Sequence, residues 1–254
     1  MNRSFSEYVA LGDSMSIDLY PALDAGKTDV SVALERVEGA GMIAPIGAAS
    51  LFYRNDDETQ PDESGSDLAS MFPGIRYRRL ASDGATIGDV FGEQLAQLGE
   101  GDADTLITLT IGSEDLFSAF SRSPKKILLD QITADLIEAY DLLVSAIAAA
   151  RPNALMILTT VLDPSDRIGK VEGILDDGPL GLAALDAYNA NIRTIAQGDN
   201  MALADAYGHF LGHGATQPEE HRWYWRRSPI EINATGAHEL RKLWMESLRE
   251  ALYT

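Results

Sequence analysis

The sequence predicts an α/β fold in which helices cover both faces of a parallel sheet. Short β-like runs alternate with longer helical ones about five times along the chain, as in repeated strand–helix units. The 254 residues suit one domain with a sizeable core. Hydrophobic residues make up 45% of the chain, which is too high for a disordered protein. We therefore expect a single domain over residues 1–254.

Five apolar runs have the length and composition of strands. They are Tyr8–Leu11, Ile75–Ala81, Leu106–Ile111, Ala154–Val161 and Met201–Ala204. The third run is rich in β-branched residues and apolar at both alternate sets of positions, which is typical of a strand buried on both faces. We therefore place this third run at the centre of the sheet.

Four longer segments have the apolar periodicity of helices. They are Thr86–Leu98, Pro124–Ala150, Pro179–Gln197 and Ala234–Leu252. In the first of them, apolar residues recur every three or four positions and form one stripe. The second begins with a proline, which suits a first helical turn. These segments supply the helices that the sheet needs on its faces.

Residues 24–74 do not fit this alternation. They include a Gly/Ala-rich stretch, Gly39–Ala49, and a polar, acidic, turn-rich stretch at residues 55–67. One interpretation is an irregular acidic excursion on the solvated surface. The other is a lid over an active site.

Composition excludes several classes of function. The chain has 39 Asp plus Glu against 20 Lys plus Arg, a net charge of -19, and no cysteine. The missing cysteines exclude a disulfide framework, a thiolate zinc site and a cysteine nucleophile. The negative charge argues against nucleic-acid binding and favours neutral or cationic small ligands. No run resembles a signal-peptide core or a membrane span, so we expect a cytoplasmic protein, with its oligomeric state open.

Residues able to do chemistry follow three of the predicted strands. Gly12-Asp13-Ser14 follows the first, residues 82–86 with Gly84 follow the second, and Gly112-Ser113-Glu114-Asp115 follows the third. Ligands of open parallel sheets bind at the carboxyl ends of the strands. We therefore expect these segments to converge on one site, with Ser14 as the candidate nucleophile.

The order of these segments resembles the blocks of the SGNH, or GDSL-type, hydrolases, a family of esterases and acylhydrolases. Gly12-Asp13-Ser14 matches the nucleophile block, and Gly84 matches the glycine that donates an oxyanion-hole N–H. The third block, G-x-N-D, matches at Gly112 and Asp115, but Glu114 replaces its asparagine.

The last block of that family, D-x-x-H-P-N-x-x-G, aligns with residues 228–236. Its asparagine and its glycine match Asn233 and Gly236, whereas Ser228 replaces the acid and Glu231 replaces the histidine. The four blocks occur in the right order along essentially the whole chain. The departures therefore concern the catalytic groups more than the fold.

The resemblance implies a three-layer α/β/α, flavodoxin-like fold with a five-stranded parallel sheet. It also implies a lipase- or acylhydrolase-like enzyme that cleaves a small-molecule ester through Ser14, without an organic cofactor. The N–H groups of Ser14 and Gly84 would form the oxyanion hole. We assign Asp13, Asp115 and Asn233 to supporting hydrogen bonds that hold the loops.

The two glutamates change the expected chemistry. A glutamate near pKa 4.3 is a poorer base than an imidazole near 6.5, and an ionised carboxylate cannot donate a hydrogen bond to an oxyanion. Two carboxylates in one dry site cannot both ionise easily, so the pKa of one rises. Our hypothesis is that Glu114 is protonated and donates to the oxyanion, while Glu231 is ionised and accepts the Ser14 proton.

Three alternatives stay open. A histidine from the loop upstream of the last block, His213 or His221, is a rival base. Asp13, Glu114, Asp115 and Glu231 are a possible oxygen-rich site for Mg²⁺ or Ca²⁺. The third alternative is a non-catalytic member of the fold that acts as a binding module.

Overall fold

Five parallel strands form the central sheet of the computed structural model, which describes residues 3–28, 43–122, 126–171, 175–176 and 178–253. In chain order they are β1 (Glu7–Gly12), β2 (Arg76–Arg79), β3 (Thr105–Thr110), β4 (Leu155–Thr159) and β7 (Met201–Ala204). They lie in the order β2-β1-β3-β4-β7, and all neighbouring pairs are parallel. This flavodoxin-like order has its topological switch point between β1 and β3.

Both faces of the sheet are apolar. In β1, Val9 and Leu11 belong to one core cluster, whereas Tyr8 and Ala10 belong to the other. Successive side chains of a strand point to opposite faces, so each strand contributes to both clusters. Two such faces can be buried only by helices on both sides of the sheet.

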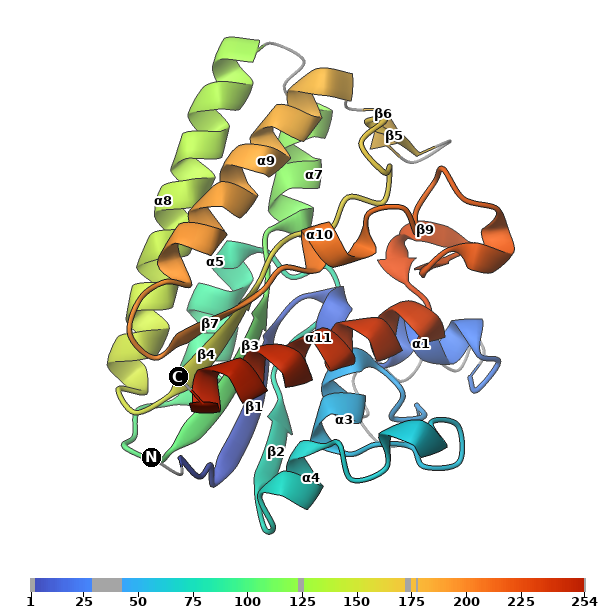
Figure 1. Ribbon diagram of the computed structural model, residues 1–254. Helices are drawn as coiled ribbons and strands as arrows, with labels where there is room; N and C mark the ends of the chain where they lie inside the picture. The colour runs from blue at the N-terminus through green and yellow to red at the C-terminus, as the bar shows by residue number, and fades with distance from the viewer. Residues whose placement is uncertain (1–2, 29–42, 123–125, 172–174, 177, 254) are drawn as a thin grey trace.

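Those helices form the two outer layers (Figure 1). The first core cluster packs under α5 (Ile87–Asp89), α6 (Leu95–Leu98), α7 (Ser113–Arg122), α8 (Lys126–Ala150) and α9 (Gly178–Ile195). A π-helical turn, Val90–Gln94, joins α5 to α6. The second cluster packs under α3 (Ala48–Tyr53), α4 (Leu68–Met71) and α11 (Ala234–Tyr253), and α1 (Leu19–Asp24) contacts α11. The three-layer α/β/α prediction is therefore confirmed.

The remaining elements are short. Two antiparallel pairs are β5 (Lys170–Val171) with β6 (Leu175–Asp176) and β8 (Tyr224–Trp225) with β9 (Ser228–Ile232). Helix α10 (Ala206–Phe210) follows β7, and the 3-10 turns are η1 (Ser14–Ser16), η2 (Pro61–Glu63) and η4 (Glu219–His221). The β8–β9 hairpin matters for function because it carries Glu231 immediately before α11.

The structure corrects part of the expectation for residues 24–74. Its described part contains α3 and α4, and Ala48, Phe52 and Leu68 in these helices are fully buried. This part is therefore not simply an irregular solvated excursion. Residues 29–42, which include the start of the Gly/Ala-rich stretch, lie outside the described residues. The lid over an active site stays a prediction.

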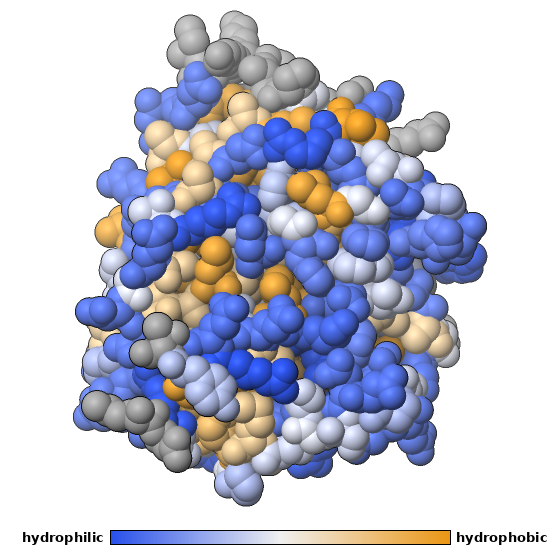
Figure 2. Space-filling model, in the orientation of Figure 1, coloured by the Kyte–Doolittle hydropathy of each residue, from blue (hydrophilic) through white to orange (hydrophobic). Residues whose placement is uncertain are grey.

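The surface seen in Figure 2 is mostly hydrophilic, with apolar residues scattered over it. The exposed large hydrophobic side chains among the described residues are Phe91, Leu142, Ile168 and Tyr253. No helix in the described part of the chain combines the length and the apolar character that crossing a membrane requires.

Candidate active site

The carboxyl end of β1 holds Ser14 in a fixed, buried turn. Gly12 has φ +119°, and a Cβ there would lie 1.7 Å from the carbonyl oxygen of Thr110 in β3. Only glycine therefore permits this approach of the two strands. The carboxylate of Asp13 accepts from the Met15 N–H at 3.1 Å and caps η1. Ser14 follows at once and is 6% exposed.

A side-chain amide closes the end of β1. The Gly12 N–H donates to Oε1 of Gln94 at 2.8 Å, and Nε2 of Gln94 donates to the Gly12 carbonyl at 2.8 Å. Gln94 is 2% exposed and lies in the π-helical turn after α5. Sequence analysis missed this positioning residue. The signal available in the sequence was a glutamine placed among the apolar residues of Thr86–Leu98.

Asp13 and Asp115 tie the segments after β1, β2 and β3 together. The Ser113 hydroxyl donates to Asp13 at 2.6 Å, and Asp115 accepts from the Ile87 N–H at 3.0 Å. Burial raises the pKa of Asp13 to about 6, although the Ser113 hydroxyl and the Met15 N–H act in the opposite direction. Both carboxylates thus lie where supporting residues are needed.

The loop after β2 carries Gly84 on the rim of the site. Gly84 has φ +64°, and open space surrounds the position of a Cβ. The Tyr20 hydroxyl donates to both oxygens of Asp83, at 3.0 and 3.1 Å. The Tyr20 ring packs on Trp225, with 5.7 Å between ring centroids. Tyr20 and Asp83 are site residues that sequence analysis did not assign.

Glu231 lies in β9 and faces Ser14. Burial raises its pKa to about 8; a side-chain hydrogen bond from Ser14 lowers the pKa, and the charges of Asp13, Asp83 and Glu114 raise it. Its Oε2 atom is buried and has no hydrogen-bond partner among the described residues. The carboxylate at the histidine position therefore sits in a dry, acidic environment.

This result bears on the hypothesis about the two glutamates, which stays a prediction. We assigned the protonated state to Glu114 and the ionised state to Glu231; the raised pKa means that Glu231 ionises fully only at alkaline pH. The cause is desolvation of the Glu231 carboxylate; Glu114 lies in the first turn of α7, where it accepts from the Ser118 hydroxyl at 3.1 Å.

One cavity of about 290 Å³ brings these groups together. The predicted residues Asp13, Ser14, Gly84, Glu114 and Glu231 all line it, with Tyr20 and Asp83. Most of its wall is apolar and comes from α7, α9 and the segment after β4; the apolar lining includes Leu116, Phe117, Phe120, Val161, Leu162, Leu182 and Leu185. Five carboxylates and no Lys, Arg or His line it within the described part of the chain.

Asn233 supports the β8–β9 hairpin from its base. Its Nδ2 donates to the carbonyls of Arg222 and Tyr224, at 2.7 and 3.3 Å, and its Oδ1 accepts from the Gly236 N–H at 2.8 Å. The residue therefore fixes both the hairpin and the first turn of α11. It holds Glu231 in place without lining the cavity.

The four histidines lie elsewhere. His209 bonds Glu239 at 3.1 Å, His213 stacks on Trp223 with 3.5 Å between centroids, and His221 ends η4. His213 and His221 line a separate hollow that does not include Ser14. His238 is half-buried in α11. The structure thus gives no support to a histidine base.

The divalent-cation alternative lacks a ligand set. No group of three or more His, Asp or Glu side chains among residues 3–28, 43–122, 126–171, 175–176 and 178–253 could hold a metal ion. Asp13 and Asp115 use their oxygens on Ser113 and Ile87 instead. The four carboxylates named in the sequence therefore do not form the oxygen cage that was considered.

Several solved structures with this architecture are described as lipases, phospholipases or esterases. Phospholipase A1 from Streptomyces albidoflavus superposes with a TM-score of 0.66 at 20% identity, covering 96% of this chain and 100% of the other. A protein termed a GDSL-like lipase, from Parabacteroides merdae, gives a TM-score of 0.55 at 13% identity, with 96% of each chain covered. The chain has the SGNH/GDSL hydrolase fold.

Other structures with the SGNH/GDSL fold act on different esters. An acetylxylan esterase from Geobacillus stearothermophilus gives a TM-score of 0.57 at 16% identity, covering 98% of this chain and 96% of the other. Neither a scan against protein-family models nor a search of curated proteins gave a match. At such identities the likeness establishes the fold, and the activity has to be argued from the site.

Proposed function

We propose that this chain hydrolyses carboxylic esters, with Ser14 as nucleophile and Glu231 as general base. The observation that carries the proposal is the Ser14 hydroxyl bonded to a buried carboxylate whose pKa is raised to about 8. A glutamate of ordinary pKa would be a weak acceptor of the serine proton. Burial makes this carboxylate more basic than an ordinary histidine, so it suits a general base at mildly alkaline pH.

The proposed reaction has two halves. The Ser14 oxygen attacks the acyl carbonyl carbon, while its proton passes to the Glu231 carboxylate. The tetrahedral intermediate then breaks its bond to the alcohol oxygen, and the Glu231 carboxyl returns the proton to that oxygen. In the second half, water attacks the acyl carbon of the acyl-serine while Glu231 accepts a water proton; the bond to the Ser14 oxygen then breaks, Glu231 returns the proton to that oxygen, and the acid is released.

The oxyanion would be held by two backbone donors, the N–H groups of Ser14 and Gly84. Glu114 stands where the family has an asparagine, and an ionised carboxylate there repels the oxyanion rather than donating to it. A glutamine at this position would supply the N–H donor. The charge of Glu114 also helps to keep the Glu231 pKa high.

The cavity fits the acyl part of a small ester. Its volume of about 290 Å³ is at the lower end of small-ligand pockets, and its deeper wall is apolar. The carboxylates near Ser14 disfavour an anionic group on the substrate, because no cationic side chain lines the described cavity. We therefore propose a short- or medium-chain ester of a neutral or cationic alcohol.

Labelling with a fluorophosphonate tests the proposal. Measured by intact mass at about pH 9, the wild type is expected to take one adduct, Ser14→Ala none, and Glu231→Gln one only very slowly. Glu58→Gln, which changes an exposed glutamate, is the matched control and should label like the wild type. An unreactive wild type would contradict the proposal and favour the alternative of a binding module.

A further inference from the structure

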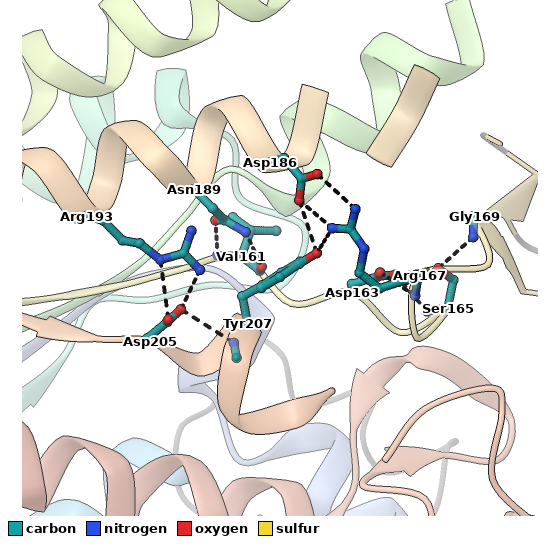
Figure 3. A network of polar contacts seen from close by, with 11 residues as sticks. Val161, Asp163, Ser165, Arg167, Gly169, Asp186, Asn189, Arg193, Asp205 and Tyr207 are labelled. Atoms are coloured by element: carbon teal, nitrogen blue, oxygen red, sulfur yellow. Dashed lines mark hydrogen bonds and ion pairs between the residues drawn. The ribbon is translucent and has the colours of Figure 1, made fainter. Parts of the chain in front are cut away.

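The segment after β4 forms one whole wall of the cavity. Val161, Leu162, Asp163, Pro164, Ser165 and Gly169 all line it. This segment lies between α9 and α10 and contains no regular secondary structure from residue 160 to residue 169 (Figures 1 and 3). A wall made of irregular backbone keeps its shape only where other groups fix it.

Asn189 of α9 fixes the start of the wall. Its Oδ1 accepts from the Val161 N–H at 2.8 Å, and its Nδ2 donates to the Val161 carbonyl at 2.8 Å (Figure 3). Asn189 is fully buried, although it does not line the cavity. The amide therefore binds the wall as a neighbouring strand would, but from a helix.

The middle of the wall is a strained turn. Asp166 and Arg167 have φ +52° and +69°, which non-glycine residues rarely adopt. Asp163 holds this turn by accepting from the N–H groups of Ser165 and Arg167, at 2.9 and 2.8 Å. Two consecutive residues in this conformation persist only when the surroundings determine it, and such strain concentrates at functional sites.

Two outward contacts complete the clamp. The Asp166 carboxylate accepts from the N–H groups of Gly212, Gly214 and Thr216, at 2.9 to 3.1 Å. The Arg167 guanidinium bonds both carboxylate oxygens of Asp186 on α9, at 2.6 and 3.1 Å, and also the Tyr207 hydroxyl (Figure 3). The wall is thus attached on both of its sides.

We propose that residues 161–169 are the acyl-selectivity wall, and that Asn189 is the positioning residue that sets how long an acyl chain the cavity accepts. The inference rests on the proposed ester hydrolysis and adds the residue that determines its substrate range. The wall lines the same cavity as Ser14 and the apolar side chains of α7 and α9, so its position affects the space available beside Ser14. A released wall would admit longer chains without moving Ser14, which β1 and Gln94 hold separately.

The test compares Asn189→Ala with Asn191→Ala. Asn191 lies two residues further along α9 and bonds Asp141 at 2.6 Å on the exposed side, so it is a matched control. The kcat and KM are measured on p-nitrophenyl acetate and octanoate at about pH 9. We expect Asn189→Ala to raise the octanoate-to-acetate ratio of kcat/KM at least about threefold, mainly through KM for octanoate, with kcat for acetate within about twofold of the wild type.

Each outcome either supports or overturns the role of Asn189. An unchanged ratio in folded Asn189→Ala, or equal losses on both esters, would overturn the inference, because a merely structural residue affects both substrates alike. If Asn189→Ala does not fold, Arg167→Met releases the same wall from the surface and is expected to shift the ratio in the same direction. No turnover of either ester by the wild type would instead overturn the proposed function, and this inference with it.

Discussion

The raised pKa of Glu231 predicts how the free energy of unfolding depends on pH. Burial raises this pKa from 4.5 to about 8. Between these values the folded chain keeps a proton that the unfolded chain releases, so the free energy of unfolding falls as pH rises through this window. At 1.36 kcal/mol per pKa unit, ionising Glu231 costs the fold up to about 5 kcal/mol by pH 9.

Glu231→Gln isolates this effect, because glutamine resembles the protonated glutamate and does not ionise. Near pH 4.5 the two proteins should have similar stability; near pH 9 the variant should be more stable by several kcal/mol, up to about 5. Urea denaturation at both pH values measures this difference, with Glu58→Gln as the exposed control. A stability difference that does not vary with pH would refute the reasoning.

Three further predictions follow from the site. Glu114→Gln removes one of the charges that raise the Glu231 pKa, so the pH–rate profile should rise at lower pH than in the wild type, and an unshifted profile would count against that coupling. Gly12→Ala should lower the free energy of unfolding by about 3 kcal/mol or more, because its Cβ would meet the backbone of Thr110. Gly84→Ala should lower it by about 1 kcal/mol, because the position of its Cβ is open space. Equal losses of the two variants in urea denaturation would contradict this. At low salt the wild type should have a higher kcat/KM for choline butyrate, a cationic ester, than for the neutral 3,3-dimethylbutyl butyrate, because carboxylates line the cavity. Asp83→Asn should reduce this difference, and equal kcat/KM values in the wild type would contradict the prediction.

The sheet could be predicted because its signal is local. Each predicted strand overlaps an observed one, and Met201–Ala204 has the predicted bounds. Apolar runs between turn residues report burial directly, and the order of strands and helices then restricts the topology. Helix α7 was not predicted, because Ser113, Glu114 and Asp115 were interpreted as a turn with carboxylates, although such residues also suit a first helical turn.

The electrostatics of the site could not be predicted in the same way. The sequence placed Ser14, Gly84, Glu114 and Glu231 in blocks that the fold brings to one cavity. Which glutamate is buried depends on the β8–β9 hairpin, and neither residue type nor spacing reveals its path. Gln94 is a related case: its place among apolar residues is visible in the sequence, but its role is clear only from its bonds to β1. A cytoplasmic location stays a prediction.

Side-chain amides hold two strand ends in addition to the backbone bonds of the sheet. Gln94 does this for β1 and Asn189 for the chain just after β4. Each amide satisfies one N–H and one C=O, and the Gly12 carbonyl also accepts from the Ser82 N–H at 3.1 Å. The loop at residues 82–86 therefore helps to hold the nucleophile, besides carrying Gly84. Loop exchange aimed at new substrates is better directed at residues 161–169, which are attached to α9 and to residues 212–216.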